Sequence, residues 1–223
     1  VILPYLKQQG ISCLEAVVLT HTDQDHINGV MEVLEEGKKG WLTVKHLLYP
    51  CWMEETEQGR ELQKLAKEAG ASCQGIRAGD QLELGNAEAA VIYPGDEETV
   101  MEPNAGSLVL CWEWAGVRTL FTGDLPEEKE RELLQKLPVC EILQVGHHGS
   151  ATSTCQEFLD RVQPSLAVIS CALTNRYGHP APDTVERLEK NGCEIRYTMK
   201  GGAVTVRQRG KEIRVEEYVT GGQ

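Results

Sequence analysis

Basic side chains are scarce in this sequence. Its 22 lysines and arginines compare with 34 aspartates and glutamates, which gives a formal net charge of −12 at pH 7. Proteins that hold DNA by its phosphates usually carry a basic stripe, and none is visible here. We expect most carboxylates, such as those in 54–61 and 127–132, on solvated helix faces, and a few to bind cations.

Long apolar runs and paired cysteines are also missing. No run approaches the roughly 18 apolar residues of a membrane-spanning helix. Eight cysteines occur singly and never as Cys-x-x-Cys, which argues against a zinc ribbon or a redox motif; we expect mostly reduced core residues. The chain opens on Val1 rather than on Met and a basic stretch, so we expect no signal peptide and a longer parent protein.

Short apolar runs and helical patterns are mixed along the chain, without low-complexity segments or linkers. The length fits one domain, 1–223. Strands are predicted at 15–19, 44–48, 81–84, 89–93, 108–114, 117–121, 142–145, 166–170, 194–198, 203–208 and 213–217. Helices are predicted at 27–36, 56–69, 126–136, 155–162 and 182–191. Hairpins mixed with single helices predict an α/β (α+β) fold, an αββα sandwich of two sheets with helices outside.

One strand end is followed by four side chains that can bind metal. His21, Asp23, Asp25 and His26 come directly after the apolar run 17–19. Residues 21, 23 and 25 alternate, so in an extended backbone they project to one side, and His26 turns into the next helix. A helix-capping loop needs only one such residue. The segment therefore predicts imidazole and carboxylate groups that converge beyond the strand.

Three later strand ends carry weaker versions of the same pattern. Asp124 follows one strand, and alone it would be an ordinary turn residue. The adjacent His147 and His148 follow another. Their side chains must diverge, so at most one is expected to share a metal site with the first loop, while the other faces substrate. His179 follows a third strand, where a lone histidine is more often structural. Together the four loops predict a metal site.

The order of these motifs resembles a known family. The motifs are His21-x-Asp-x-Asp-His26, Asn104 with Ser107-Leu-Val-Leu, Thr122-Gly-Asp124, His147-His-Gly-Ser150 and Tyr177-Gly-His-Pro180. They occur in the order found in the C-terminal metallo-β-lactamase-like domain of the ComEC family of competence DNA-uptake channels. The resemblance covers residues 2–206. The family's opening strands, with a Gly-Gln-Gly-Asp-like segment, have no counterpart, so we expect a sandwich that lacks its first N-terminal strands.

The resemblance implies a site with two divalent ions. It assigns His21 and Asp23 to one ion and Asp25 and His26 to the other, with Asp124 as the bridge. His148, in preference to His147, would complete the second site.

The resemblance also implies the metal and the remaining roles. Asn104 and Asp23 stand where many relatives carry histidine, and oxygen in place of nitrogen favours Mn²⁺ over Zn²⁺, with zinc still possible. Asp25, His147 and His179 would take part in catalysis. The residues implied to contact substrate are Asn104, Ser107 and Ser150.

The implied function is a hydrolase that cuts phosphodiester bonds. In the family context it is a nuclease that degrades the DNA strand that is not imported, with single-stranded DNA as substrate. The domain would be a soluble part of a membrane channel protein and face the outside of the cell; otherwise it would be cytoplasmic. Two alternatives stay open. One is a hydrolase of a small ester or phosphodiester, favoured by the net charge of −12, and the other is a non-catalytic docking module stabilised by metal.

Overall fold

The structure, a computed structural model, describes residues 2–96, 102–210 and 212–218. The chain folds as two compact units. Unit 1 comprises Val1–Asp80 and Tyr93–Leu108, and unit 2 comprises Gln81–Ile92 and Val109–Gln223. None of the helices in the described part of the chain combines the length and apolar character that crossing a membrane requires.

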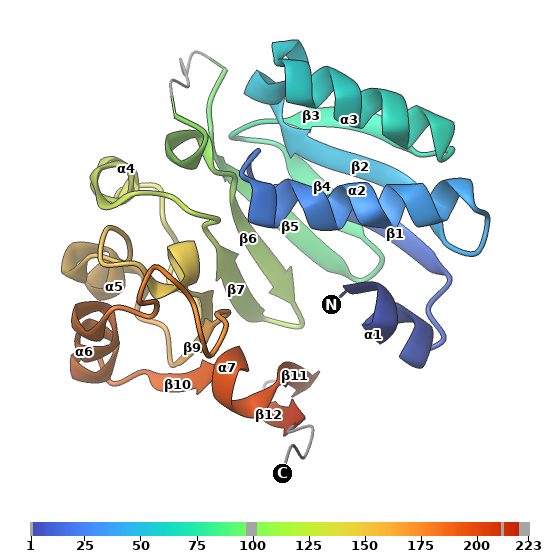
Figure 1. Ribbon diagram of the computed structural model, residues 1–223. Helices are drawn as coiled ribbons and strands as arrows, with labels where there is room; N and C mark the ends of the chain where they lie inside the picture. Colours follow the sequence, from blue (N-terminus) through green and yellow to red (C-terminus); the bar gives the residue numbers. More distant parts are fainter. Residues whose placement is uncertain (1, 97–101, 211, 219–223) are drawn as a thin grey trace. The chain divides into compact units, whose positions relative to one another are not determined.

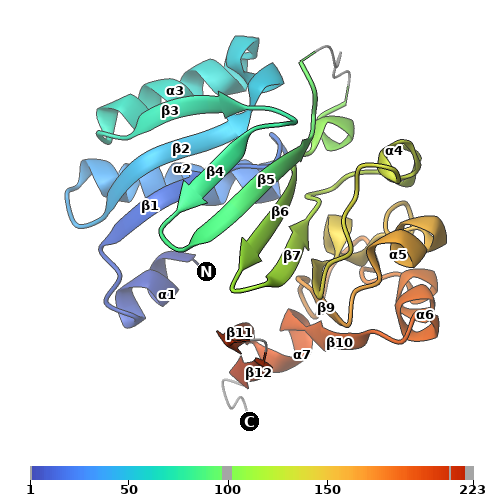
Figure 2. The ribbon, with the colours of Figure 1, turned by 180° about the vertical axis from the view of Figure 1, so that it is seen from behind.

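Unit 1 is a parallel sheet covered by helices. Its elements are α1 (Ile2–Gln8), β1 (Cys13–Val18), α2 (Gln24–Lys38), β2 (Thr43–Pro50), η1 (Cys51–Glu55), α3 (Glu57–Glu68), β3 (Ser72–Ile76) and η2 (Asn104–Gly106). The strand order is β1-β2-β3, and both neighbouring pairs are parallel. Figure 1 shows α2 and α3 side by side over one face of this sheet, and Figure 2 shows the other face.

The start of α3 shows how local sequence fixes this layer. The hydroxyl of Thr56 accepts a hydrogen bond from the backbone N–H of Gly59 (3.0 Å), so Thr56 is the N-cap of the helix. A Cβ on Gly59 would lie 1.8 Å from the carbonyl oxygen of Met53, so only glycine fits. Leu62 and Leu65 then recur at helical spacing and are buried against the sheet.

Unit 2 is built on a mixed sheet of seven strands in the order β10-β9-β8-β7-β6-β5-β4, with a separate hairpin of β11 and β12. Its elements are β4 (Gln81–Leu84), β5 (Ala87–Tyr93), β6 (Val109–Trp114), β7 (Val117–Phe121), α4 (Glu127–Leu133), β8 (Ile142–Gln144), η3 (Gly146–Gly149), α5 (Gln156–Val162), β9 (Leu166–Ile169), α6 (Pro182–Lys190), β10 (Glu194–Tyr197), α7 (Thr198–Gly201), β11 (Ala203–Arg209) and β12 (Glu212–Tyr218).

Strand direction in this sheet positions the candidate site. The pairs β4–β5 and β6–β7 are antiparallel, whereas β7, β8, β9 and β10 are parallel neighbours. Parallel strands place their carboxyl ends at the same edge of a sheet. The loops that follow β7, β8 and β9 therefore meet there. The helices α4, α5 and α6 lie one beside the next along this part of unit 2 (Figure 1).

The predicted mixed α/β class is confirmed, as are the two hairpins, β6–β7 and β11–β12. The prediction of one domain stays a prediction. The strand Ser72–Ile76 and the helix Ile2–Gln8 were not predicted. The helix expected at 27–36 begins earlier, at Gln24, and the one expected at 126–136 ends at Leu133. Four of the eight free cysteines are buried, in keeping with core positions.

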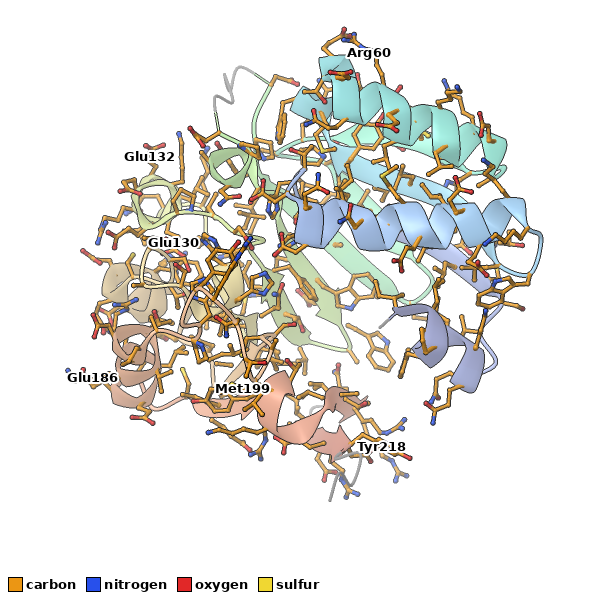
Figure 3. The ribbon with its side chains drawn as sticks, viewed as in Figure 1. Arg60, Glu130, Glu132, Glu186, Met199 and Tyr218 are labelled. Carbon is orange, nitrogen blue, oxygen red and sulfur yellow. The ribbon has the colours of Figure 1, made fainter. Side chains whose placement is uncertain are left out.

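A buried carboxylate joins the helices of unit 2. Glu130 of α4 is fully buried (Figure 3), and its two oxygens accept the backbone N–H groups of Thr154 (2.7 Å) and Cys155 (2.8 Å), at the start of α5. Burial raises the pKa of Glu130, while these backbone hydrogen bonds act in the opposite direction. Arg187 of α6 donates to the carbonyl oxygens of Thr154 (2.9 Å) and Ser153 (3.1 Å). The segment before α5 is thus held from two helices.

We expect Glu130→Gln to lower the free energy of unfolding by about 1–3 kcal/mol, because the amide nitrogen cannot accept a hydrogen bond and leaves one buried N–H without an acceptor. Urea unfolding measures this difference. Glu128→Gln is the matched control, since Glu128 is exposed on the same helix. Equal stability of the two variants would contradict the structural role of Glu130.

Candidate metal centre

In unit 1, one hydroxyl organises two histidines. The Oγ1 atom of Thr20 lies 3.0 Å from Nδ1 of His21 and 3.4 Å from Nδ1 of His26, and the two imidazole centroids are 4.1 Å apart. Each ring therefore turns its Nε2 atom the other way. The Nε2 atom of His21 lies 4.0 Å from Oδ2 of Asp23, and the Nε2 atom of His26 lies 3.9 Å from Oδ2 of Asp25. The loop presents two nitrogen–carboxylate pairs, a donor set that divalent metals bind.

The backbone of this loop differs from the prediction. The expected alternation of residues 21, 23 and 25 holds only for the first two, because α2 begins at Gln24 and places Asp25 and His26 in its first turn. Asp23 occupies the N-cap position with extended dihedrals (φ −63°, ψ 148°), yet its side chain makes no capping hydrogen bond. The alternative of a simple helix-capping loop therefore does not describe Asp23.

A second segment of unit 1 lies against the same strand end. The backbone N–H of Leu108 donates to the carbonyl oxygen of Thr20 (2.9 Å), which brings residues 104–107 beside the histidine loop. Ser107 is fully buried. The Oδ1 atom of Asn104 is buried too, and within residues 2–96, 102–210 and 212–218 no hydrogen bond reaches it. A buried acceptor of this kind fits a metal or substrate contact.

In unit 2, Asp124 follows β7 and is buried, with 3% of the residue exposed. The backbone N–H of His147 donates to the carbonyl oxygen of Gly123 (3.0 Å), so the loops after β7 and β8 are tied together. The Nε2 atom of His147 lies 3.6 Å from Oδ2 of Asp124. The carboxyl ends of the parallel strands thus bring an imidazole to the buried carboxylate.

The two adjacent histidines lie beyond the end of the strand, in a sharp turn. Strand β8 ends at Gln144, and both His147 (φ 49°) and His148 (φ 55°) adopt left-handed backbone conformations. Non-glycine residues rarely do so, and such strain concentrates at functional sites. The sharp turn gives the two imidazoles different partners, as expected for histidines with separate roles.

The partner of His148 favours it as a ligand. Its Nδ1 donates to the carbonyl oxygen of Ser170 (2.7 Å) after β9, so the neutral ring carries its proton on Nδ1 and its lone pair on Nε2, the tautomer of a histidine that binds metal through Nε2. Asp124 and His148 each offer a ligand atom, and these atoms lie within 4.8 Å of one another. Unit 2 therefore contributes an oxygen and a nitrogen donor that fit a divalent ion.

His179 lies in the loop between β9 and α6. Its imidazole centroid is 5.7 Å from that of His147, in an edge-on arrangement. Burial lowers the pKa of His179, and the neighbouring His147 and His148 lower it further, while Asp124 has the opposite effect. The neutral imidazole that results at pH 7 can donate one N–H hydrogen bond and accept another.

Ser150 and Thr20 have positions that sequence reasoning did not anticipate. Ser150 is buried, its hydroxyl lies 3.0 Å from that of Thr152, and its carbonyl oxygen accepts the hydroxyl of Thr184 (2.8 Å). These contacts hold the histidine loop, and a role for Ser150 in substrate binding stays a prediction. Thr20 was missed, although a hydroxyl directly before His21 is a signal that could have found it.

Residues 2–172 match the Metallo-beta-lactamase superfamily. The chain belongs to this superfamily. It is 33% identical over 213 residues to ComE operon protein 3 of Bacillus subtilis (strain 168), with 95% of this chain and 27% of that protein covered. It is 30% identical over 205 residues to Recombination protein 2 of Haemophilus influenzae, with 92% and 24% covered. The chain thus spans about a quarter of the length of these relatives.

Solved structures share the fold at low sequence identity. CmlA, a diiron beta-hydroxylase from Streptomyces venezuelae, matches with a TM-score of 0.57 at 13% identity, over 92% of this chain and 45% of that chain. The metallo-beta-lactamase fold protein YhfI from Bacillus subtilis matches with a TM-score of 0.55 at 13% identity, over 82% and 74%. A protein named Competence protein ComA, from Neisseria gonorrhoeae, is also among the relatives. The superfamily and the competence-related resemblance expected from the motifs are both confirmed.

The different partners of the two adjacent histidines predict different phenotypes. We expect His148→Ala to lower the affinity for divalent metal, because it removes a nitrogen donor. His147→Ala is expected to keep the metal content and lower the turnover of bis-p-nitrophenyl phosphate about 10²–10⁴-fold, as the loss of an acid–base or substrate contact does. Competition with a chromogenic chelator measures the affinity.

The matched control is His46→Ala, because His46 is exposed on β2 and contacts Ser72. Exchanged phenotypes would reverse the assignment of the two histidines. If neither substitution changed metal affinity or turnover, the loop after β8 would be a structural turn only.

Proposed function

We propose that this chain is a binuclear metal-dependent phosphodiesterase that cleaves DNA, with single-stranded DNA as its substrate during competence-related DNA uptake. The observation that carries the proposal is the pairing of imidazole Nε2 atoms with carboxylates in the loop after β1, where Thr20 holds both rings by their other nitrogens. The similarity to a protein named Competence protein ComA, from Neisseria gonorrhoeae, supports the context (27% identity, covering 91% of this chain and 26% of that protein).

The family resemblance supplies the proposed assignment of ligands to a pair of ions. His21 and Asp23 would hold one ion, and Asp25 and His26 the other. By the same resemblance, Asp124 is proposed as the bridge and His148 as a further nitrogen donor. The chemistry of the set supports this assignment, since imidazole nitrogens and carboxylate oxygens bind Mn²⁺ and Zn²⁺ alike.

Bound ions would supply Lewis acidity toward the phosphate and a water of lowered pKa. The other roles belong to side chains of this chain. Asp25 would orient the attacking water by its carboxylate. His147, whose Nε2 lies 3.6 Å from the buried Asp124, would hold a proton for the leaving oxygen. His179 would donate a hydrogen bond to a phosphoryl oxygen, and Asn104 and Ser107 would contact the substrate.

The proposal extends to the setting of the domain. The curated relatives are roughly four times as long as the aligned part of this chain. We propose that the domain is attached to a membrane channel portion of the same polypeptide and faces the outside of the cell. In that position it would degrade the strand that does not enter the channel.

A hydrolase of a small ester or phosphodiester is the second candidate. The net charge of −12 favours it, because an acidic protein repels a polyanion. A salt titration of binding to single-stranded DNA separates the two. If the protein is a nuclease, its contacts with several phosphates make the affinity for DNA fall steeply with salt concentration. If its site is built for a small substrate with a single phosphate, the affinity for DNA depends only weakly on salt.

We expect Asp124→Asn to abolish hydrolysis of bis-p-nitrophenyl phosphate and leave the urea unfolding midpoint close to that of the wild type. The neutral amide offers one oxygen in place of the carboxylate proposed to bridge two cations. Asp160→Asn, at an exposed aspartate of α5, is the matched control. Turnover like that of the wild type in Asp124→Asn would remove Asp124 from the reaction.

Mn²⁺ is expected to support more turnover than Zn²⁺ at equal occupancy. Asp23 and Asn104 provide oxygen where many relatives provide nitrogen, and hard oxygen donors favour Mn²⁺. Elemental analysis of protein loaded with each metal, paired with a turnover assay on the same sample, measures this preference. A clear preference for zinc would show that the oxygen donors do not decide the metal.

A further inference from the structure

We propose that Tyr177 and Arg176 form a nucleobase-binding subsite beside the catalytic histidines. The base would stack on the Tyr177 ring, and the guanidinium of Arg176 would pair with the adjoining phosphate. The identity of the occupant rests on the proposed function, because a nucleobase is expected only if the substrate is a nucleic acid.

The first observation is exposure. Tyr177 is 66% exposed and Leu173, in the same loop, is 75% exposed. Both lie between β9 and α6, in the segment that also carries His179. Exposed aromatic and aliphatic side chains that gather beside a polar site are typical of ligand contacts. The loop therefore presents an apolar surface next to groups that can act on a phosphate.

The second observation is the arrangement of planar groups. The rings of Tyr177 and His179 are stacked, with centroids 5.7 Å apart and planes inclined by 17°. The guanidinium of Arg176 lies over the Tyr177 ring, 4.9 Å from its centroid, and donates to the phenol oxygen (2.6 Å). Arg176 is itself exposed, so a planar base can displace its guanidinium and leave it to a phosphate.

The third observation is that the loop is held in shape by the side chain of Asn175, which bonds the backbone of the same loop. The Oδ1 atom of Asn175 accepts the N–H groups of Tyr177 (3.2 Å) and His179 (2.9 Å). Its Nδ2 atom donates to the carbonyl oxygens of Ala172 (3.1 Å) and His179 (2.7 Å). The ring of Tyr177 is thus carried on an ordered turn before any ligand binds, which lowers the entropic cost of binding.

The fourth observation is an open pocket of about 680 Å³, formed largely by residues on either side of Tyr177 in the same loop. Arg176, Asn175 and His179 line it, together with Met199 of α7 (Figure 3). The volume lies within the usual range for small-ligand sites. A pocket with a guanidinium on one side and apolar carbon on another suits a nucleotide, which has an anionic and an aromatic part.

The position of the subsite relates it to the chemistry. His179 links the two regions, since its ring contacts Tyr177 on one side and His147 on the other. His147 in turn lies 3.6 Å from Asp124. A base on Tyr177 would therefore belong to a nucleotide next to the phosphate that is cut. Stacking needs little positive charge, which reconciles binding of single-stranded DNA with a net charge of −12.

The test compares Tyr177→Ala with the wild type on two single-stranded substrates of equal length, oligo-dT and an abasic oligomer. We expect the substitution to raise KM for oligo-dT about 5- to 100-fold, the loss that follows removal of one stacked base. KM for the abasic oligomer should not change. Tyr177→Phe should behave like the wild type. Tyr218→Ala is the matched control, because Tyr218 is an equally exposed tyrosine of unit 2 (63%; Figure 3).

Arg176→Ala gives an independent readout. It should reduce the slope of log affinity against log salt by about 0.7, the value for one phosphate contact on a single strand. Tyr177→Ala should leave that slope unchanged. Fluorescence anisotropy with labelled oligo-dT and the labelled abasic oligomer measures binding without any need for turnover.

The outcomes separate this proposal from the proposed function. If the wild type cleaves both oligomers and Tyr177→Ala changes neither KM, or changes both equally, the subsite is wrong and the phosphodiesterase stands. If the wild type cleaves no phosphodiester, the proposed function fails. Binding then decides the subsite, and equal affinity of wild type and Tyr177→Ala for oligo-dT would overturn it.

Discussion

The parallel pairing of β7, β8 and β9 determines where unit 2 places its candidate metal-binding side chains. Each of these strands delivers its chain to the same edge of the sheet. Asp124, the two adjacent histidines and Ser170 consequently come together from three separate stretches of sequence. Nothing within any one loop would hold them there. The hydrogen bond from His147 to Gly123 and the bond from His148 to Ser170 then fix their orientation.

In unit 1 fewer residues are needed to bring the candidate side chains together and orient them. Its histidines lie only five positions apart, one before α2 and one in its first turn. A single hydroxyl, that of Thr20, contacts the Nδ1 atoms of both rings. In unit 2, a carbonyl oxygen at the end of a strand has this role for His148. In both units the supporting contact is made by Nδ1, and a hydrogen bond of this kind is how proteins commonly orient an imidazole that binds metal through its other nitrogen.

The sequence allowed prediction of the strand ends that carry the site, because apolar runs stop abruptly before His21, Asp124 and His147. It did not reveal the strand Ser72–Ile76, in which polar residues and Gly75 interrupt the apolar pattern. A Cβ at Gly75 would lie 2.3 Å from the carboxylate oxygen of the flexible Glu54 side chain and 3.1 Å from Cα of Cys51, contacts that only the folded chain creates.

The local conformation of the site residues was harder to predict. Asp25 was expected in an extended segment and lies in a helix, because α2 begins before the apolar periodicity does. His147 and His148 adopt left-handed conformations that the residue types do not indicate, because glycine is the usual sign of such a conformation. Here the surrounding sheet imposes it. Family resemblance supplied the candidate residues, and the fold supplied their orientation.

The hydrogen bonds of Asn175 end within its own loop, on Ala172, Tyr177 and His179. The shape of that turn therefore depends little on the rest of unit 2, and none of the proposed metal ligands lies in it. Substitutions at 173, 174, 176 and 177, which leave Asn175 and His179 in place, are therefore expected to cost little in metal binding or in the core. Divergence at these four positions would change the contacts to substrate, while Asn175 keeps the imidazole of His179 in place.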